Sequence, residues 1–183
     1  MKFGLTTRAA VAADAEAVCT VLRQAILETC VDEHRHDQVI LDAWLGNKHP
    51  AQIAAWMAAP ANFMVVAEAA EDGVTRVVGV ALINQAGKLA LCHVLPQAQR
   101  RGVGKALLDA AEAQARRWGV STVRIHGTVN SQAFYAQFGY LNAGKDKTCY
   151  GVECDLLWKQ LDALPGAAAG SKRFCSCNPN NSP

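Results

Sequence analysis

Residues 99–105 read QRRGVGK, and this segment is the most informative part of the sequence. It follows an apolar segment that stops at Pro96, and it precedes an amphipathic segment over residues 103–118, so it joins a predicted strand to a predicted helix. The first turn of a helix leaves backbone N–H groups unpaired and carries partial positive charge. Because Gly102 and Gly104 carry no side chain and basic residues surround them, we predict a cradle for a phosphate or pyrophosphate.

This loop differs from two common nucleotide-binding loops. A P-loop requires GxxxxGK[ST], and although Lys105 follows Gly104, no glycine lies five residues before that glycine. The turn also lacks GxGxxG, the fingerprint of dinucleotide-binding folds. The plainer alternative is a tight helix start whose basic residues are simply solvated.

The segments on either side of the loop alternate between strand and helix patterns. We predict that Asp14 caps the first helix, that Pro50 lies in the first turn of the third, and that Asp72-Gly73 forms a hairpin turn. The predicted strands cover residues 2–8, 63–67, 74–83, 88–95, 122–126, 140–145 and 149–157, and the later helices cover 37–47, 51–58, 103–118 and 131–138. This order predicts a mixed α/β domain with too few parallel crossovers for a Rossmann fold or a barrel.

Length and composition fit one globular domain. The chain has 183 residues, of which 51% are hydrophobic and 19% charged, and its formal net charge of +2 is too mild to indicate nucleic-acid binding. No apolar run approaches the ~20 residues that a membrane span needs, and no apolar stretch of the kind found in secretory signals follows Lys2. We therefore expect a cytoplasmic protein with a domain over residues 1–164 and a mobile tail over residues 165–183.

The seven cysteines do not indicate a disulfide framework, because their number is odd and most lie singly in apolar segments. Cys175 and Cys177 form a pair in the tail, but two thiols cannot complete a zinc site. His34, His36 and Asp37 are neighbours without a fourth ligand nearby. We therefore expect no metal cofactor.

Two motifs, taken together, resemble the Gcn5-related N-acetyltransferase (GNAT) superfamily. The spacing Gln99-x-x-Gly102-x-Gly104 after an apolar strand is similar to the acetyl-CoA loop of that family. Residues 130–135, NSQAFY, followed by FGY at 138–140, look like its later motif, in which a helix carries a Phe-Tyr pair and ends at glycine. The element order fits from about residue 4 to residue 161.

The resemblance implies an α/β fold of the α+β type, in which a mixed, mostly antiparallel sheet is splayed at its centre and has helices on both faces. The strands over 89–95 and 122–126 would part, and the pantetheine arm of acetyl-CoA would pair with the backbone of Val94 or Leu95 between them. The cofactor-binding residues that the resemblance implies are Val94, Leu95, Gln99, Arg100, Arg101, Gly102, Val103, Gly104, Lys105, Asn130 and Phe134.

The activity implied by the resemblance is transfer of an acetyl group from acetyl-CoA to a primary amine, by direct attack in a ternary complex. An alkyl amine with a pKa near ~10.4 is mostly protonated at pH 7, so the reaction needs a proton acceptor for the ammonium and a donor for the CoA thiolate. Tyr135 matches the position of the family's general acid. The alternative is that Tyr135 only packs beside Phe134 and Phe138.

The general base has no clear candidate, because the strand over residues 88–94 lacks the acidic residue that many family members carry there. His93 is the nearest titratable group, and His126 lies at the end of the next strand. Glu33 lies in an acidic segment that suits a cationic amine, so it is a candidate for the base or for amine binding. Each of these residues also has a structural alternative, as a packed histidine or a solvated carboxylate.

Other functions fit the same motifs. A domain that binds acyl-CoA as a sensor, without transfer, would share Tyr135 and the loop with an enzyme. Transfer of a longer acyl chain depends on the depth of the binding slot, which motifs do not reveal. The paired strands near the C-terminus are compatible with a homodimer.

Overall fold

The computed structural model describes residues 4–148 and 150–162. The strands are β1 (Gly4–Ala9), β2 (Asn62–Glu71), β3 (Val74–Asn84), β4 (Leu89–Val94), β5 (Thr122–Gly127), β6 (Leu141–Lys147) and β7 (Glu153–Gln160). The helices are α1 (Ala15–Thr29), α2 (Val31–His34), α3 (Gln38–Leu45), α4 (Pro50–Ala58), α5 (Val103–Arg117) and α6 (Gln132–Gln137), with short 3₁₀ turns η1 (Ala12–Asp14), η2 (Pro96–Ala98) and η3 (Val129–Ser131). The predicted tail and its two cysteines lie outside the described residues.

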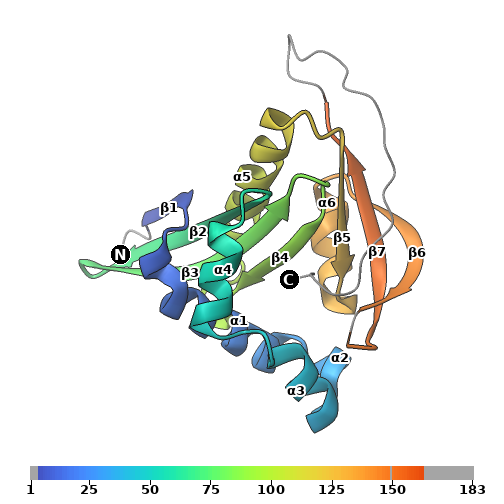
Figure 1. Ribbon diagram of the computed structural model, residues 1–183, viewed down its shortest axis with the longest axis horizontal. Helices are drawn as coiled ribbons and strands as arrows, with labels where there is room; N and C mark the ends of the chain where they lie inside the picture. Colours follow the sequence, from blue (N-terminus) through green and yellow to red (C-terminus); the bar gives the residue numbers. More distant parts are fainter. Residues whose placement is uncertain (1–3, 149, 163–183) are drawn as a thin grey trace.

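The strands form two antiparallel sheets, in the orders β1-β2-β3-β4 and β5-β7-β6. A parallel bridge between Lys88 and Arg124 joins them where β4 and β5 begin. Beyond that bridge the two strands diverge, as Figure 1 shows. The prediction of a mostly antiparallel sheet, splayed at its centre with helices on both faces, is confirmed.

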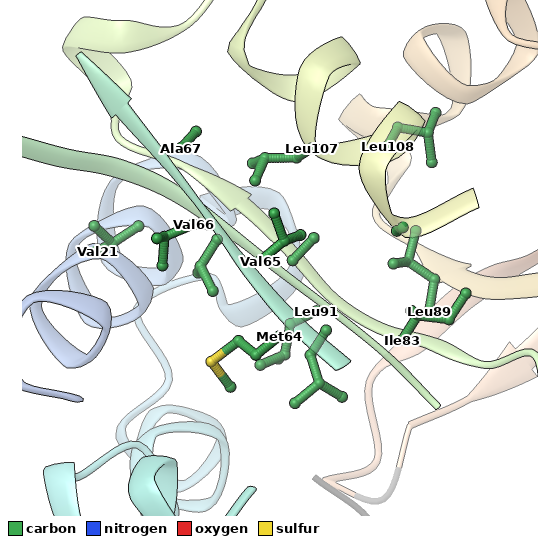
Figure 2. Packing of buried hydrophobic residues seen from close by; sticks show 14 of the residues in the cluster. Val21, Met64, Val65, Val66, Ala67, Ile83, Leu89, Leu91, Leu107 and Leu108 are labelled. Atoms are coloured by element: carbon green, nitrogen blue, oxygen red, sulfur yellow. The ribbon is translucent and has the colours of Figure 1, made fainter. Parts of the chain in front are cut away.

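The first sheet is buried on both faces, which explains the nearly continuous apolar runs of β2 and β3. Helix α1 packs on one face of this sheet and α5 on the other. Figure 2 shows Val21 of α1 and Leu107 of α5 on opposite sides of the strands. Each fully buried aliphatic side chain contributes about 1.5–3 kcal/mol, so packing on both faces stabilises this sheet.

The local signals at two turns are confirmed. Asp72 and Gly73 both have positive φ, 51° and 80°, as a type I′ hairpin turn between β2 and β3 requires. Pro50 is the first residue of α4. Asp37 caps α3 by accepting hydrogen bonds from the Val39 and Ile40 N–H groups.

The predicted capping role of Asp14 is wrong. Its carboxylate makes no cap hydrogen bond to α1. It accepts one from the Val11 N–H at 2.8 Å and pairs with Arg8 of β1 at 2.7 Å. Asp14 therefore ties the first strand to the chain that enters α1, because the arginine offers a stronger, charge-assisted partner.

Within the ranges that the structure describes, no helix combines the length and apolar character needed to cross a membrane.

Candidate active site

The free edge of β4 is the first component of the site. The Leu95 N–H donates to the Val78 carbonyl at 2.9 Å, and the Leu95 carbonyl accepts from the Ala98 N–H at 2.9 Å. Backbone groups on an antiparallel strand alternate in direction, so those of the preceding residue, Val94, point away from β3 and towards the split. Of the two residues predicted to pair with a ligand backbone, Val94 has the suitable geometry, whereas Leu95 is already engaged.

The loop over residues 99–105 ends in an open helix start. The first intrahelical bond of α5 runs from the Ala106 N–H to the Gly102 carbonyl at 3.0 Å, so the N–H groups before Ala106 precede the helical ladder. Gly102 has a φ of 84°, and a Cβ placed on it would meet no atom within 4 Å. A side chain at this position would therefore be strained and would extend into the open space before the helix.

Gly104 also has a packing role. A Cβ on Gly104 would lie 3.1 Å from the Phe134 ring, closer than nearly all real contacts of this kind. The absence of a side chain thus lets α6 approach the first turn of α5 closely. The two sequence motifs meet in this contact.

The basic side chains of the loop are exposed to solvent. Arg101 pairs with Glu71 at 2.5 Å, and Lys105 pairs with Asp109 one turn along α5. Arg100 is exposed and has a positive φ of 59°. Exposed pairs of this kind contribute at most about 1 kcal/mol each, so these cations can turn towards an anion at little cost.

Tyr135 lies inside an aromatic cluster beneath the split. Its ring packs edge-on against Phe134 at 5.0 Å and Tyr140 at 5.4 Å, and the residue is 3% exposed. The Cys92 thiol of β4 lies close to its hydroxyl. Burial, together with the nearby thiol, raises the pKa of Tyr135 well above its ordinary value, so the phenol is protonated at every physiological pH.

His93 lies on the opposite face of β4 from this cluster. Its cross-strand partner Val80 is one residue from Gly79, whose Cβ position points at α5, and neighbouring residues of a strand face opposite ways. Burial lowers the pKa of His93 to about 4, and the charge of Lys48 adds to the effect. A neutral imidazole in this state is a weak proton acceptor.

Helix α2 brings the acidic segment to the connection between β5 and α6. Glu33 Oε1 accepts a hydrogen bond from the Val129 N–H at 2.9 Å, while its Oε2 is buried and, within the described ranges, has no hydrogen-bond partner. Asp32 accepts a hydrogen bond from the Asn130 side chain at 2.6 Å. The predicted cofactor residue Asn130 is therefore held by α2, and Glu33 keeps one carboxylate oxygen available.

His34 is fully buried beside them. Its Nδ1 accepts a hydrogen bond from the His36 N–H at 3.0 Å, which leaves the proton of a neutral ring on Nε2. Within residues 4–148 and 150–162, this Nε2 has no hydrogen-bond partner.

A family model for the acetyltransferase (GNAT) domain matches residues 27–154. The chain belongs to the GNAT acetyltransferase family. The matched range includes α2, the loop over 99–105, the aromatic cluster and most of the second sheet.

Two solved GNAT structures share the fold. A Gcn5-related N-acetyltransferase from Rhodopseudomonas palustris superposes with a TM-score of 0.74 at 22% identity, covering 88% of this chain and 99% of that one. The second is the PaiA N-acetyltransferase of Thermoplasma acidophilum in complex with coenzyme A. It superposes with a TM-score of 0.71 at 15% identity, and the match covers 86% of this chain and 99% of that one.

A sequence relative is similar over a shorter range. A Bacillus subtilis protein classed as an acetyltransferase is 30% identical over 84 residues, or 46% of this chain. The matched segment spans 57% of the relative's length.

Cys92 is not among the predicted site residues, because a single cysteine in an apolar strand is typical of a core. The period of two along a strand was the available signal, since it places Cys92 on the same face as Val94. Lys48 was also missed, because only tertiary packing brings it close to His93.

Other sites are not indicated in the described residues. No group of three or more His, Cys, Asp and Glu side chains in that part of the chain is arranged to hold a metal ion. A shallow hollow of about 190 Å³, lined by Thr7, Phe63, Ala113, Arg117 and their neighbours, lies between β1, β2 and α5 and contains none of the predicted site residues.

Proposed function

We propose that this GNAT protein transfers an acetyl group from acetyl-CoA to a primary amine, by direct attack within a ternary complex. The observation that carries the proposal is a continuous path along β4. It begins at the Cys92–Tyr135 contact, passes the outward backbone of Val94 and reaches the open helix start at Gly102. A thioester, a pantetheine arm and a pyrophosphate follow one another in the same order in acetyl-CoA.

The cofactor would be held mainly by backbone groups. The N–H and carbonyl of Val94 would pair with the pantetheine amides as an added strand does. The first N–H groups of α5 would bind the pyrophosphate, with the helix dipole favouring its charge. Gln99, Arg100, Arg101 and Lys105 lie around the same turn, where their side chains can reach the outer phosphates.

Tyr135 would serve as the general acid. When the amine nitrogen bonds to the acetyl carbon, the C–S bond breaks and the sulfur needs a proton. The buried, protonated phenol supplies a donor close to Cys92 of β4.

Glu33 would bind the ammonium group of the acceptor. Its Oε1 is fixed by the Val129 N–H, so the buried Oε2 has a defined position and an unused electron pair. Burying a carboxylate oxygen without a partner is costly, and a cationic amine would remove that cost.

A sensor that binds acyl-CoA without transfer is the second candidate, because His93, the nearest titratable group on β4, is a weak base. Calorimetric titration with acetyl-CoA, with ATP and NAD as controls, tests the shared binding step. A thiol-release assay over a panel of amines then separates the two functions. Binding with release supports the enzyme, binding without release supports the sensor, and no binding contradicts both.

A further inference from the structure

The connection from β5 into α6 has little support from the core. In residues 128–134, all of which the structure describes, no side chain is buried, and Val129 is 58% exposed. The preceding strand turns its histidine elsewhere, because His126 Nε2 lies 3.0 Å from Asp146 Oδ2 of β6. The first buried side chain after this connection belongs to Tyr135, the proposed general acid. Core packing therefore fixes the ring of Tyr135 but not the turn that leads to it.

This turn also has no capping side chain of its own. Thr128 precedes η3 and Ser131 precedes α6, but neither side chain accepts a hydrogen bond from the helical N–H groups that follow it. The Ser131 hydroxyl instead donates to the Thr128 carbonyl at 2.9 Å. Neither first turn contains an acidic residue. The N–H groups at this helix start therefore depend on partners from another segment.

Two neighbouring carboxylates of α2 bind this turn. Glu33 Oε1 accepts a hydrogen bond from the Val129 N–H at 2.9 Å, across 96 residues of sequence. Asp32 Oδ2 accepts one from the Asn130 side-chain amide at 2.6 Å. A carboxylate suits this position, because it forms charge-assisted hydrogen bonds and favours the positive end of a helix. Helix α2 therefore caps the helical turn that leads into α6.

Helix α2 is itself fixed by buried neighbours. His34 is fully buried, and Glu33 is 9% exposed. Their N–H groups donate to the carbonyl of buried Cys30 at 3.1 and 3.2 Å, respectively. The His34 ring accepts a further hydrogen bond from the His36 N–H at 3.0 Å. The Glu33 carboxylate thus has a defined position, to which the exposed turn is attached.

A shift at the start of α6 would reach Tyr135, because the helix is short. It spans the six residues Gln132–Gln137. Phe134 packs on Gly104 in the first turn of α5, and the Tyr135 hydroxyl lies close to the Cys92 thiol of β4. A displacement of about 1 Å can cost much of a reaction rate when it moves a reacting group. The cap from α2 therefore bears on the position of the acid.

We propose that Glu33, supported by Asp32, is a positioning residue for Tyr135. Its Oε1 caps the turn that leads into α6 and so holds the phenol where the thioester would lie. This inference rests on the proposed acetyltransfer with Tyr135 as the acid. Glu33 then has two tasks on separate oxygens, since Oε2 would bind the ammonium. Kinetics separates the two, because ammonium binding affects KM and positioning of the acid affects kcat.

The test compares Glu33→Gln with Glu33→Ala, using CoA thiol release with the amine that reacts fastest. In Glu33→Gln the amide oxygen still accepts from the Val129 N–H, so the cap remains while the charge is lost. Glu33→Ala loses both. We expect kcat to be about fivefold lower in Glu33→Ala than in Glu33→Gln, with the acetyl-CoA Kd of both within about twofold of wild type. Glu28→Ala, at an exposed position on α1, is the matched control and should change neither value.

A double-mutant cycle shows whether this loss acts through Tyr135. In the Tyr135→Phe background the acid is already absent, so Glu33→Ala and Glu33→Gln should have equal kcat. A fivefold difference that persists in that background overturns the proposal. Equal kcat of the two Glu33 variants in the presence of Tyr135 overturns it as well.

Hydrogen–deuterium exchange of backbone amides tests the cap without any turnover. The amides of residues 129–137 should exchange about fivefold faster in Glu33→Ala than in the wild type, whereas Glu33→Gln and Glu28→Ala should keep their protection. Unchanged exchange in Glu33→Ala overturns the proposal whether or not the protein is an enzyme. Failure of the wild type to bind acetyl-CoA or to release thiol overturns the proposed function instead, and the exchange result still tests the cap.

Asp32→Ala is the second variant, for the case that Glu33→Ala unfolds the whole chain. Asp32 is exposed, so the loss of its hydrogen bond to Asn130 leaves the core intact. We expect faster exchange confined to residues 129–137 and a kcat about twofold lower. No change in either measurement would then overturn the proposal.

Discussion

The two faces of the split are built in different ways. The α5–α6 face uses two compact motifs, in which Gly102 opens a helix start and Tyr135 lies in an aromatic cluster that touches the first turn of α5. The α1–α2 face draws Glu33 and His93 from two separate segments. The first face therefore depends on local backbone geometry, and the second on tertiary packing.

From this difference we propose separate tasks for the two faces. Backbone groups recognise the parts of a ligand that do not vary, and the cofactor would occupy the face that supplies them. Side chains from separate segments can change one at a time, and the acceptor would meet that face. Single substitutions should accordingly affect either cofactor affinity or acceptor chemistry.

The largest effect is expected from Gly102→Val, which breaks the cofactor face. Valine is strained at a φ of 84°, and its branched side chain fills the space before α5. We expect acetyl-CoA affinity to fall by about 100-fold or more, a loss of about 2.7 kcal/mol, measured by calorimetry.

Gly119→Val is the matched control for this variant. Gly119 has a φ of 71° and open space around its Cβ position, and it lies just beyond the other end of α5. Both variants carry similar backbone strain, but the control should bind acetyl-CoA normally. Full affinity in Gly102→Val would contradict the cradle.

His93→Gln tests the α1–α2 face by its effect on the free energy of unfolding. The pKa of His93 is lowered to about 4 in the folded protein, so the unfolded chain binds the proton first as the pH falls below about 6.5. The wild type should lose about 2–3 kcal/mol of stability between about pH 6.5 and pH 4 through this residue, and the variant should lose less.

Urea unfolding at several pH values measures this difference. His36→Gln, at an exposed position, is the control and should follow the wild type. Parallel curves for wild type and His93→Gln would show that His93 does not hold a lowered pKa.

Tyr135→Phe removes only the hydroxyl of the proposed general acid. We expect kcat to fall about tenfold or more, with the Kd of acetyl-CoA nearly unchanged, because a general acid acts only in the transition state. Tyr140→Phe changes another buried tyrosine of the same cluster and should retain kcat. Equal rates in wild type and Tyr135→Phe would reduce Tyr135 to a packing residue.

The smallest effect is expected from Glu33→Gln. The amide oxygen can still accept from the Val129 N–H, but the charge on the buried side chain is lost. We expect the KM of a cationic amine to rise about fivefold with kcat nearly constant, as the loss of uniform binding predicts. Glu28→Gln, at an exposed position on α1, should change neither value. A fall in kcat at constant KM would instead make Glu33 a base.

Much of the fold was predictable because its signals are local. The apolar runs of β2 and β3, the turn at Asp72-Gly73 and the helix start at Pro50 depend on neighbours within a few residues. The predicted cap at Asp14 was wrong because its carboxylate pairs with Arg8 of β1 rather than with the nearby helix N–H groups. The contact between Gly104 and Phe134 was not predictable, because the two residues belong to segments that lie far apart in the chain.

The order of elements, the helix start at residues 99–105 and the Phe-Tyr motif can be read from the chain alone, since backbone conformation and residue spacing define them. That Val94 rather than Leu95 faces the split, and that α2 contacts the chain after β5, depends on the folded arrangement of distant segments. The physical reason is that hydrogen-bond direction, burial and charge pairing depend on which strands become neighbours, and residues far apart in the chain settle that together.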